Sequence, residues 1–287
     1  MIRIRFMAAG LALLALAAFA AQAGRTWWHE QAAERDLLRR VNTKVPIPKL
    51  GAVICPWLRP AGEPRPLVLL VLGQSNAGNH GGEQVPLPLA RPPSVTITDG
   101  NACWRVSDPL PGGTGRHQSI WSRLEHALAA RGSQREVVLV LLAVESTSID
   151  DWTRIGSPLS SQVDQTLRRL QGRTFDFVLW QQGESDARQG TSASEYVARW
   201  RVLEARLRAA GVNAPVLAAM STRCRNDSGV AVRQAIRNVA ALQSGVHLGP
   251  DTDALEGLLR EDDCHFSPMG LDAAAALWAE SITSRWP

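Results

Sequence analysis

Short apolar runs alternate with longer amphipathic stretches from about residue 67 to the end of the chain. The runs have the length and composition of buried strands, and the stretches between them carry apolar residues at helical spacing. Strands are predicted at 67–72, 95–98, 137–144, 175–180, 216–220 and 246–248. Helices are predicted at 119–131, 160–170, 192–210, 229–242 and 267–285.

Strands that are apolar throughout and separated by helices are typical of a parallel sheet that is covered on both faces. The predicted fold class is therefore α/β, a doubly wound, mostly parallel sheet with helices on both faces. Ligands of such sheets bind at the carboxyl ends of the strands. The residues that follow each strand are thus the first candidates for function.

The first 65 residues follow a different pattern. A basic start, an apolar run at 6–21 and the sequence Ala-Gln-Ala at 21–23 are typical of a secretory signal. An uncleaved membrane anchor is the alternative, because the run approaches the roughly 20 residues that a spanning helix needs. We therefore predict a signal peptide or anchor at 1–23, a spacer and lead-in segment at 24–65 that begins with a helix at 24–43, and the main domain at 66–287.

Composition and charge narrow the class of protein. The chain has 287 residues, 45% hydrophobic and 20% charged, which is typical of a globular protein. Its formal charge of +4 includes Arg3 and Arg5 of the predicted signal, and no basic run interleaved with aromatics follows, so no nucleic-acid partner is expected.

The cysteine count agrees with export, which places the domain in the periplasm or outside the cell, or leaves it anchored to the membrane by the N-terminal segment. The four cysteines form no Cys-x-x-Cys motif and predict two disulfides in an oxidising compartment, with three connectivities open and four buried thiols as the alternative. They are Cys55, Cys103, Cys224 and Cys264.

Candidate chemistry begins at the end of the first strand, which runs into Gly-Gln-Ser-Asn-Ala-Gly at 73–78. A tight turn there would expose the Ser75 hydroxyl at the sheet edge, where a nucleophile belongs; a serine that caps a helix is the alternative. Asp262 lies three residues before His265, close enough to accept the Nδ1 proton and leave Nε2 to take a proton from a serine. Capping of the last helix is the alternative for this pair.

Two other strand ends carry polar residues. The fourth strand runs into Gln-Gln-Gly-Glu-Ser-Asp at 181–186, and the third opens into Glu-Ser-Thr-Ser-Ile-Asp-Asp-Trp at 145–152. Both segments are predicted to reach the cleft at the strand ends. The histidines lack metal-ligand spacing and the glycine-rich segment lacks the lysine of a phosphate loop, so no metal and no other cofactor is expected.

Three motifs in this order resemble the SGNH hydrolases: Gly-Gln-Ser-Asn, Gln-Gly-Glu-Ser-Asp, and Asp-x-x-His-Phe-Ser before the last helix. The nearest branch is similar to the sialate O-acetylesterases and acetylxylan esterases, including carbohydrate esterase family 6, from about residue 67 to 285. The resemblance implies a flavodoxin-like three-layer sandwich and a cofactor-free serine esterase that removes O-acetyl groups from a carbohydrate.

The resemblance also implies roles for individual residues. Ser75 matches the nucleophile, His265 the general base and Asp262 its orienting carboxylate, whereas Asp263 has the wrong spacing. The family holds the oxyanion with the backbone amide of the serine, a backbone amide that matches Ser146, and a side-chain amide.

The side-chain amide of the oxyanion hole matches Gln182. Relatives often carry Gly-Gly-Thr-Ser where this chain has Glu-Ser-Thr-Ser at 145–148. Ser146 can therefore donate only if its backbone reaches the required angles without glycine. Glu145, if it points inward, would favour neutral acetylated sugars over acidic ones. Exposure to solvent or pairing with an arginine is the alternative for this carboxylate.

Substrate binding is predicted for five further side chains at the strand ends. Core packing is the alternative for the tryptophan of this set, and a surface salt bridge for the arginine. The five are Gln74, Asn76, Trp152, Glu184 and Arg223. Because Cys224 follows the fifth strand and Cys264 precedes the base, their loops should meet at one sheet edge, which predicts the pairs Cys224–Cys264 and Cys55–Cys103.

The expected function is that of an exported carbohydrate O-acetylesterase, with an acetylated carbohydrate as its substrate and partner. Association with a membrane is expected only if the N-terminal segment is uncleaved. One alternative is an envelope glycan O-acetyltransferase that uses the same site. Another is a non-catalytic glycan-binding protein on an esterase scaffold, which the presence of Ser75, Asp262 and His265 disfavours.

Overall fold

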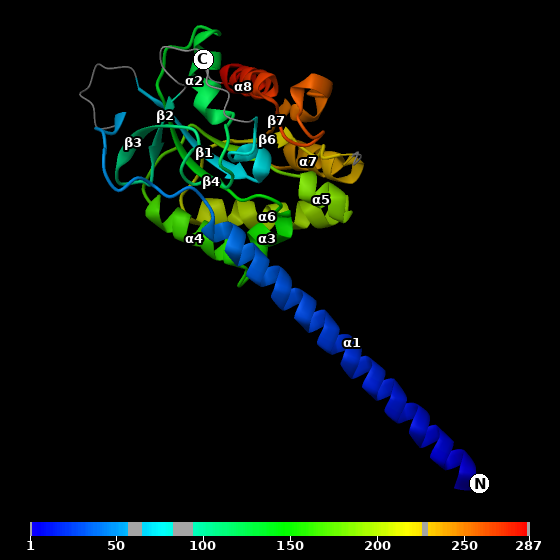
Figure 1. Cartoon of the computed structure of the whole chain (residues 1–287). Helices are drawn as coiled ribbons and strands as arrows, with labels where there is room; N and C mark the ends of the chain where they lie inside the picture. Colours follow the sequence, from blue (N-terminus) through cyan, green and yellow to red (C-terminus); the bar gives the residue numbers. More distant parts are fainter. Residues whose placement is uncertain (1, 57–64, 83–93, 226–228, 286–287) are drawn as a thin grey trace. The chain divides into compact units, whose positions relative to one another are not determined.

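The computed structural model describes residues 2–56, 65–82, 94–225 and 229–285 (Figure 1). The chain divides into two units, residues 1–39 and 40–287. Helix α1 (Ile2–Asn42) forms the described part of the first unit and confirms the helix predicted at 24–43, although it runs without a break across the predicted signal boundary.

The predicted signal run at 6–21 is helical, but its side chains, except that of Phe19, lie outside the described part of the chain, so the cleavage of the segment stays a prediction. Among the side chains that the structure describes, no helix presents a stretch long and apolar enough to cross a membrane.

Seven strands form one sheet in the described part of the second unit, in the order β3-β2-β4-β1-β5-β6-β7. Neighbouring strands are parallel except for the antiparallel pair of β2 and β3, so the predicted fold class is confirmed. The strands are β1 (Leu67–Gly73), β2 (Ser94–Thr98), β3 (Cys103–Ser107), β4 (Val137–Ala143), β5 (Phe177–Gln181), β6 (Val216–Met220) and β7 (Val246–Asp251).

Strand β3 is the one strand of this sheet that the sequence analysis missed. It is a short edge strand whose side chains alternate between buried and exposed from Trp104 onward, so it lacks the continuous apolar run that marked the other strands. The other six strands lie where they were predicted, with ends displaced by up to three residues.

Strand β1 lies at the centre of the sheet, with β4 on one side and β5 on the other. Gly73 at its end is paired with Ala143 of β4 and with Gln181 of β5. The three strands therefore end at the same level, and the segments that follow them leave the sheet at one edge. This register brings three of the predicted polar segments together.

Helices cover both faces of the sheet (Figure 1). Helices α2 (Leu124–Ala129) and α8 (Pro268–Thr283) pack together on one face, where every second residue of β1, such as Leu69 and Val71, joins their apolar cluster. The opposite face carries α3 (Ile149–Thr153), α4 (Pro158–Arg169) and α6 (Ala193–Ala209), and α6 also packs against α7 (Val230–Leu242).

Two short helices differ from the prediction. Helix α3 follows β4, and α5 (Glu184–Gln189) follows β5, at positions where the sequence analysis expected loops. A capping box in which Ser148 and Asp151 bond each other explains the start of α3. Polar residues at the end of a strand can either cap the start of a helix or face a cleft. The pattern of a single sequence does not separate these two roles.

Candidate active site

The nucleophile turn, residues 73–78, leaves the end of β1 and forms the 3-10 helix η2 (Ser75–Ala77). A Cβ on Gly73 would lie 2.1 Å from the carbonyl oxygen of Gln181, so only glycine fits where the chain turns away from β5. Ser75 is 5% exposed. Within the described residues, neither its hydroxyl nor its backbone N–H donates a hydrogen bond, so both groups are available to a ligand.

The base loop, residues 262–265, lies just before α8. The Nδ1 atom of His265 lies 2.9 Å from Oδ2 of Asp262, and the backbone N–H of His265 donates to Oδ1 of the same carboxylate at 2.7 Å. Although burial alone would raise it, these hydrogen bonds from His265 hold the pKa of Asp262 below its usual range. The carboxylate is thus charged and contacts Nδ1 of the imidazole, so that Nε2 points away from it.

Asp263 points elsewhere, in agreement with its wrong spacing. It has the left-handed φ of 57°, and its carboxylate forms an ion pair with Arg223 at 3.1 Å. Arg223 also pairs with Glu256 at 2.7 Å. The salt-bridge alternative for Arg223 is therefore the one observed, and this arginine holds the base loop instead of presenting a free cation to substrate.

The nucleophile turn and the base loop are in contact. Asn76 Nδ2 donates to the carbonyl oxygen of Cys264 at 3.1 Å and to Oε1 of Glu184 at 2.7 Å. Among the described residues no hydrogen bond joins Ser75 to His265 directly. The structure therefore brings the predicted nucleophile and base to adjoining loops without a bond between them.

Both predicted disulfides are confirmed. Cys224 pairs with Cys264, and Cys55 pairs with Cys103. The first bridge joins the loop after β6 to the base loop and adds to the ion pair of Arg223 in holding it. Two disulfides fit folding in an oxidising compartment.

Ser146 reaches the backbone conformation that glycine favours. Its φ is +53°, in the left-handed region, and the guanidinium of Arg40 donates to its carbonyl oxygen at 2.8 Å and to that of Glu145 at 2.7 Å. Ser146 is an exposed residue, and no described residue accepts a hydrogen bond from its backbone N–H. The loss of glycine therefore leaves this amide available.

The position of Gln182 does not match the predicted oxyanion role. The residue is fully buried, its amide nitrogen donates to Asp186 and, at 2.9 Å, to the carbonyl oxygen of Thr147, and its Oε1 accepts from the Tyr196 hydroxyl at 3.0 Å. The two amide hydrogens are thus used inside the protein. Gln182 holds the segment next to Ser146 and presents no donor to the cleft.

Four of the side chains that were predicted to bind substrate are also buried, which corrects the prediction for them. Trp152 is fully buried, donates to Thr147 and packs edge-on against Trp180 with 5.1 Å between the rings, so the core-packing alternative holds. The other three have at most 4% of their surface exposed. Gln74 and Asn76 lie within the nucleophile turn, and Glu184 accepts a hydrogen bond from Asn76.

Glu184 is a fully buried carboxyl group next to the nucleophile turn. Burial raises its pKa to about 7, against hydrogen bonds from Asn76 and Ser221 that favour the charged form. Oε2 of Glu184, Oδ1 of Asn76 and the hydroxyl of Ser185 are buried without a hydrogen-bond partner among the described residues. With this pKa, the Glu184 carboxyl group is neutral at pH 5 and about half protonated near pH 7.

One residue of the site was missed by the sequence analysis. His80 stacks on His265, with ring centroids 5.5 Å apart and ring planes at 24°. Its Nε2 lies 3.2 Å from Oγ1 of Thr114 and 3.5 Å from Oε2 of Glu145. Glu145 is therefore turned toward a histidine, an arrangement that neither alternative for this carboxylate included. The only signal for His80 was its place in the glycine-rich segment after Ser75.

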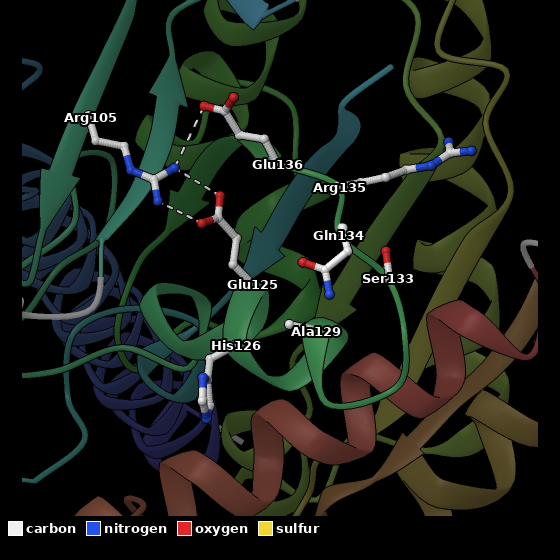
Figure 2. Close-up of a pocket in the computed structure, with 8 residues that line it drawn as sticks. All are labelled: Arg105, Glu125, His126, Ala129, Ser133, Gln134, Arg135 and Glu136. Atoms are coloured by element: carbon white, nitrogen blue, oxygen red, sulfur yellow. Dashed lines mark hydrogen bonds and ion pairs between the residues drawn. The ribbon is translucent and has the colours of Figure 1, made fainter. Parts of the chain in front are cut away.

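A separate pocket of about 550 Å³ lies beside β3 and α2 and contains none of the candidate catalytic residues (Figure 2). Arg105 extends across it to Glu125 at 2.6 Å and Glu136 at 3.6 Å. Glu136 directly precedes β4, so the pocket lies at the strand end opposite to the one that Ser75 follows. In this pocket the charges of Arg105 and Arg135 balance those of Glu125 and Glu136.

Comparison with known proteins gives a family and a fold. Residues 66–284 match the model of the family described as carbohydrate esterase, sialic acid-specific acetylesterase. No curated protein matched the sequence.

Three of the similar solved structures agree on the fold. A protein from Arabidopsis thaliana has a TM-score of 0.62 at 20% identity and covers 77% of this chain and 100% of its own. NanS has a TM-score of 0.54 at 15% identity, covering 77% and 97%. Est24, a carbohydrate acetylesterase from Sinorhizobium meliloti, has a TM-score of 0.50 at 13% identity, covering 76% and 99%.

Proposed function

The chain belongs to the sialic acid-specific acetylesterase family of carbohydrate esterases, and on that premise we propose that it is an exported serine esterase that uses Ser75, His265 and Asp262. The observation that carries the proposal is the hydrogen bond between Asp262 and His265 on a loop that Asn76 ties to the nucleophile turn. An aspartate, a histidine and a serine in this relation are the parts of a hydrolytic triad.

In the proposed reaction, the Ser75 hydroxyl attacks the acetyl carbonyl carbon while Nε2 of His265 takes its proton. Asp262 stabilises the imidazolium through Nδ1. The tetrahedral intermediate then collapses, the sugar oxygen leaves with the proton from His265, and the acetyl group stays on Ser75. Water, activated by the same histidine, releases acetate and restores the serine.

The oxyanion of the intermediate is received by the backbone N–H groups of Ser75 and Ser146. Both are without a partner among the described residues, and backbone donors of this kind stabilise charge that develops only in the transition state. Gln182 is a supporting residue here, because its bond to the Thr147 carbonyl holds the segment that carries the Ser146 amide.

Export is supported by two features. The disulfides fit an oxidising compartment, and the first 23 residues have the sequence of a secretory signal. The Cys224–Cys264 bridge beside the base would be reduced in most cytoplasmic compartments.

The test is the release of acetate by the purified protein from acetylated xylan, acetylated sialosides and acetylated envelope glycans, with Ser75→Ala as the inactive control. Release of acetate to water by the wild type alone supports the esterase. Transfer of the acetyl group to an added sugar, with little free acetate, would indicate a transferase with the same site. Binding of glycan without any release would indicate a glycan-binding protein.

A further inference from the structure

The hydrogen bond between Asp262 and His265 is too exposed to hold the base by itself. The Asp262 side chain is 55% exposed and that of His265 is 26% exposed. Exposed charged pairs contribute little, because water competes for both partners. One bond at Nδ1 also leaves the imidazole free to tilt about it, whereas a general base must be placed to within a fraction of an ångström. A second restraint is needed on the face of the ring.

His80 covers that face. The two imidazoles lie nearly parallel with centroids 5.5 Å apart, within the range of stacked aromatic pairs. His80 comes from the same segment as the nucleophile, five residues after Ser75. Its neighbour Asn79 is fully buried, and the side chain of Asn79 accepts from the Leu110 backbone at 2.7 Å and donates to the Leu110 carbonyl at 3.0 Å. The backbone that carries His80 is therefore firmly anchored.

The His80 ring is itself held at its edge by a second contact. Its Nε2 is within reach of Thr114 Oγ1, which accepts from the backbone N–H of Glu145 at 2.9 Å. Glu145 directly precedes Ser146, whose amide is proposed to receive the oxyanion. His80 thus lies between the base and the segment that carries the oxyanion donor.

The charge state of His80 suits this place. Burial, together with the nearby His265 and His117, lowers its pKa to about 4, while Asp262 opposes them. Glu145 is the remaining charged group that contacts the ring. His80 is therefore neutral above about pH 5 and does not repel the imidazolium that His265 forms while it holds the proton of Ser75.

We propose that His80 is a positioning residue that stacks on His265 and aligns the base with the nucleophile turn. This inference rests on the proposed esterase function. The stacking face acts on the base, and the Nε2 contact only helps to hold the His80 ring in place. A phenylalanine at position 80 should therefore keep most of the effect, whereas an alanine should lose it.

The experiment compares His80→Ala, His80→Phe and the control His117→Ala, which removes an exposed histidine next to the same site. Hydrolysis of an aryl acetate is measured from pH 5 to 9, together with the melting temperature. We expect His80→Ala to lower kcat by about 10- to 100-fold with little change in KM, since misplacement of a base acts on the chemical step. We expect His80→Phe to keep most of kcat with an unchanged pH profile, and His117→Ala to behave as wild type.

Full kcat in His80→Ala, at a wild-type melting temperature, would overturn the inference and leave the esterase proposal intact. So would a kcat of His80→Phe as low as that of His80→Ala when both are folded. A wild-type protein without hydrolysis would overturn both proposals together. A loss of kcat confined to variants with a lowered melting temperature would assign His80 a role in folding only.

Discussion

The nucleophile turn lies against buried strand ends, whereas the base loop lies at the surface. Ser75, Asn76 and Glu184 are at most 5% exposed, and a hydrogen bond in the interior joins Asn76 to Glu184. The base loop follows the last strand, exposes most of Asp262, and depends on the Cys224–Cys264 disulfide and the ion pairs of Arg223. A loop outside the sheet has no ladder of strand hydrogen bonds, so covalent and ionic contacts hold it.

The largest effect expected is the loss of activity when either side of the site is removed. Ser75→Ala and His265→Ala should each lower kcat for an aryl acetate by on the order of 10⁴-fold, and Asp262→Asn should leave a little activity. Asp263→Asn, the matched control one residue away, should keep most of it. Full activity of Ser75→Ala would contradict the esterase, and equal losses in the two aspartate variants would contradict the assignment of Asp262.

The second prediction separates the two disulfides. They span 40 and 48 residues, so the loss of either should lower the free energy of unfolding by a similar amount, about 4 kcal/mol. Only the Cys224–Cys264 pair adjoins the base loop. The double serine variant of this pair should therefore lose kcat at temperatures where it is still folded, while the double serine variant at Cys55 and Cys103 should keep it. Equal kcat in the two folded variants would show that the bridge does not hold the base.

The third prediction concerns the buried side of the site and uses the raised pKa of Glu184. The folded pKa of about 7 lies above the ordinary glutamate value of 4.5, so the folded state binds more protons than the unfolded state between these values. The free energy of unfolding should therefore fall as the pH rises from about 4.5 to 7, by roughly 3 kcal/mol. The contribution of Glu184 to the free energy of unfolding is fully present below pH 4.5.

Denaturant unfolding of the wild type and of Glu184→Gln at pH 5 and pH 8 measures this effect. Relative to Glu184→Gln, the wild type should be more stable at pH 5 than at pH 8, by the amount given above. Asp186, whose pKa burial raises to about 6, titrates in both proteins and cancels in the comparison. The same difference at both pH values would mean that Glu184 is not kept neutral by the fold.

The smallest effect is expected at Ser146, which bears a backbone strain that glycine would relieve. Ser146→Gly should raise the free energy of unfolding by up to about 1 kcal/mol, since a left-handed φ costs a non-glycine residue this order of energy. Ser148→Gly, two residues on at a φ of −86°, is the matched control and should not stabilise the protein. Hydrolysis by Ser146→Gly should be unchanged, because the amide is kept; a loss of kcat would mean that the serine side chain takes part.

Local patterns were enough to predict most of the fold. A buried strand is marked by a few consecutive apolar residues, so six strands were located within three residues of their ends, and the spacing of Asp262 and His265 predicted their contact. Strand β3 was missed because an edge strand lacks this mark, and the short helices α3 and α5 were missed because their polar starts resemble loops.

The individual strands and the aspartate–histidine pair could be predicted from the sequence, because each depends on residues within about ten positions of one another. Which polar side chains face the cleft depends on tertiary contacts. Gln182 is turned inward by Asp186 and Tyr196, Trp152 packs in the core, and His80 meets His265 across 185 positions of sequence. The direction of a side chain at a strand end is set by the partners that surround it, and those partners come from distant parts of the chain.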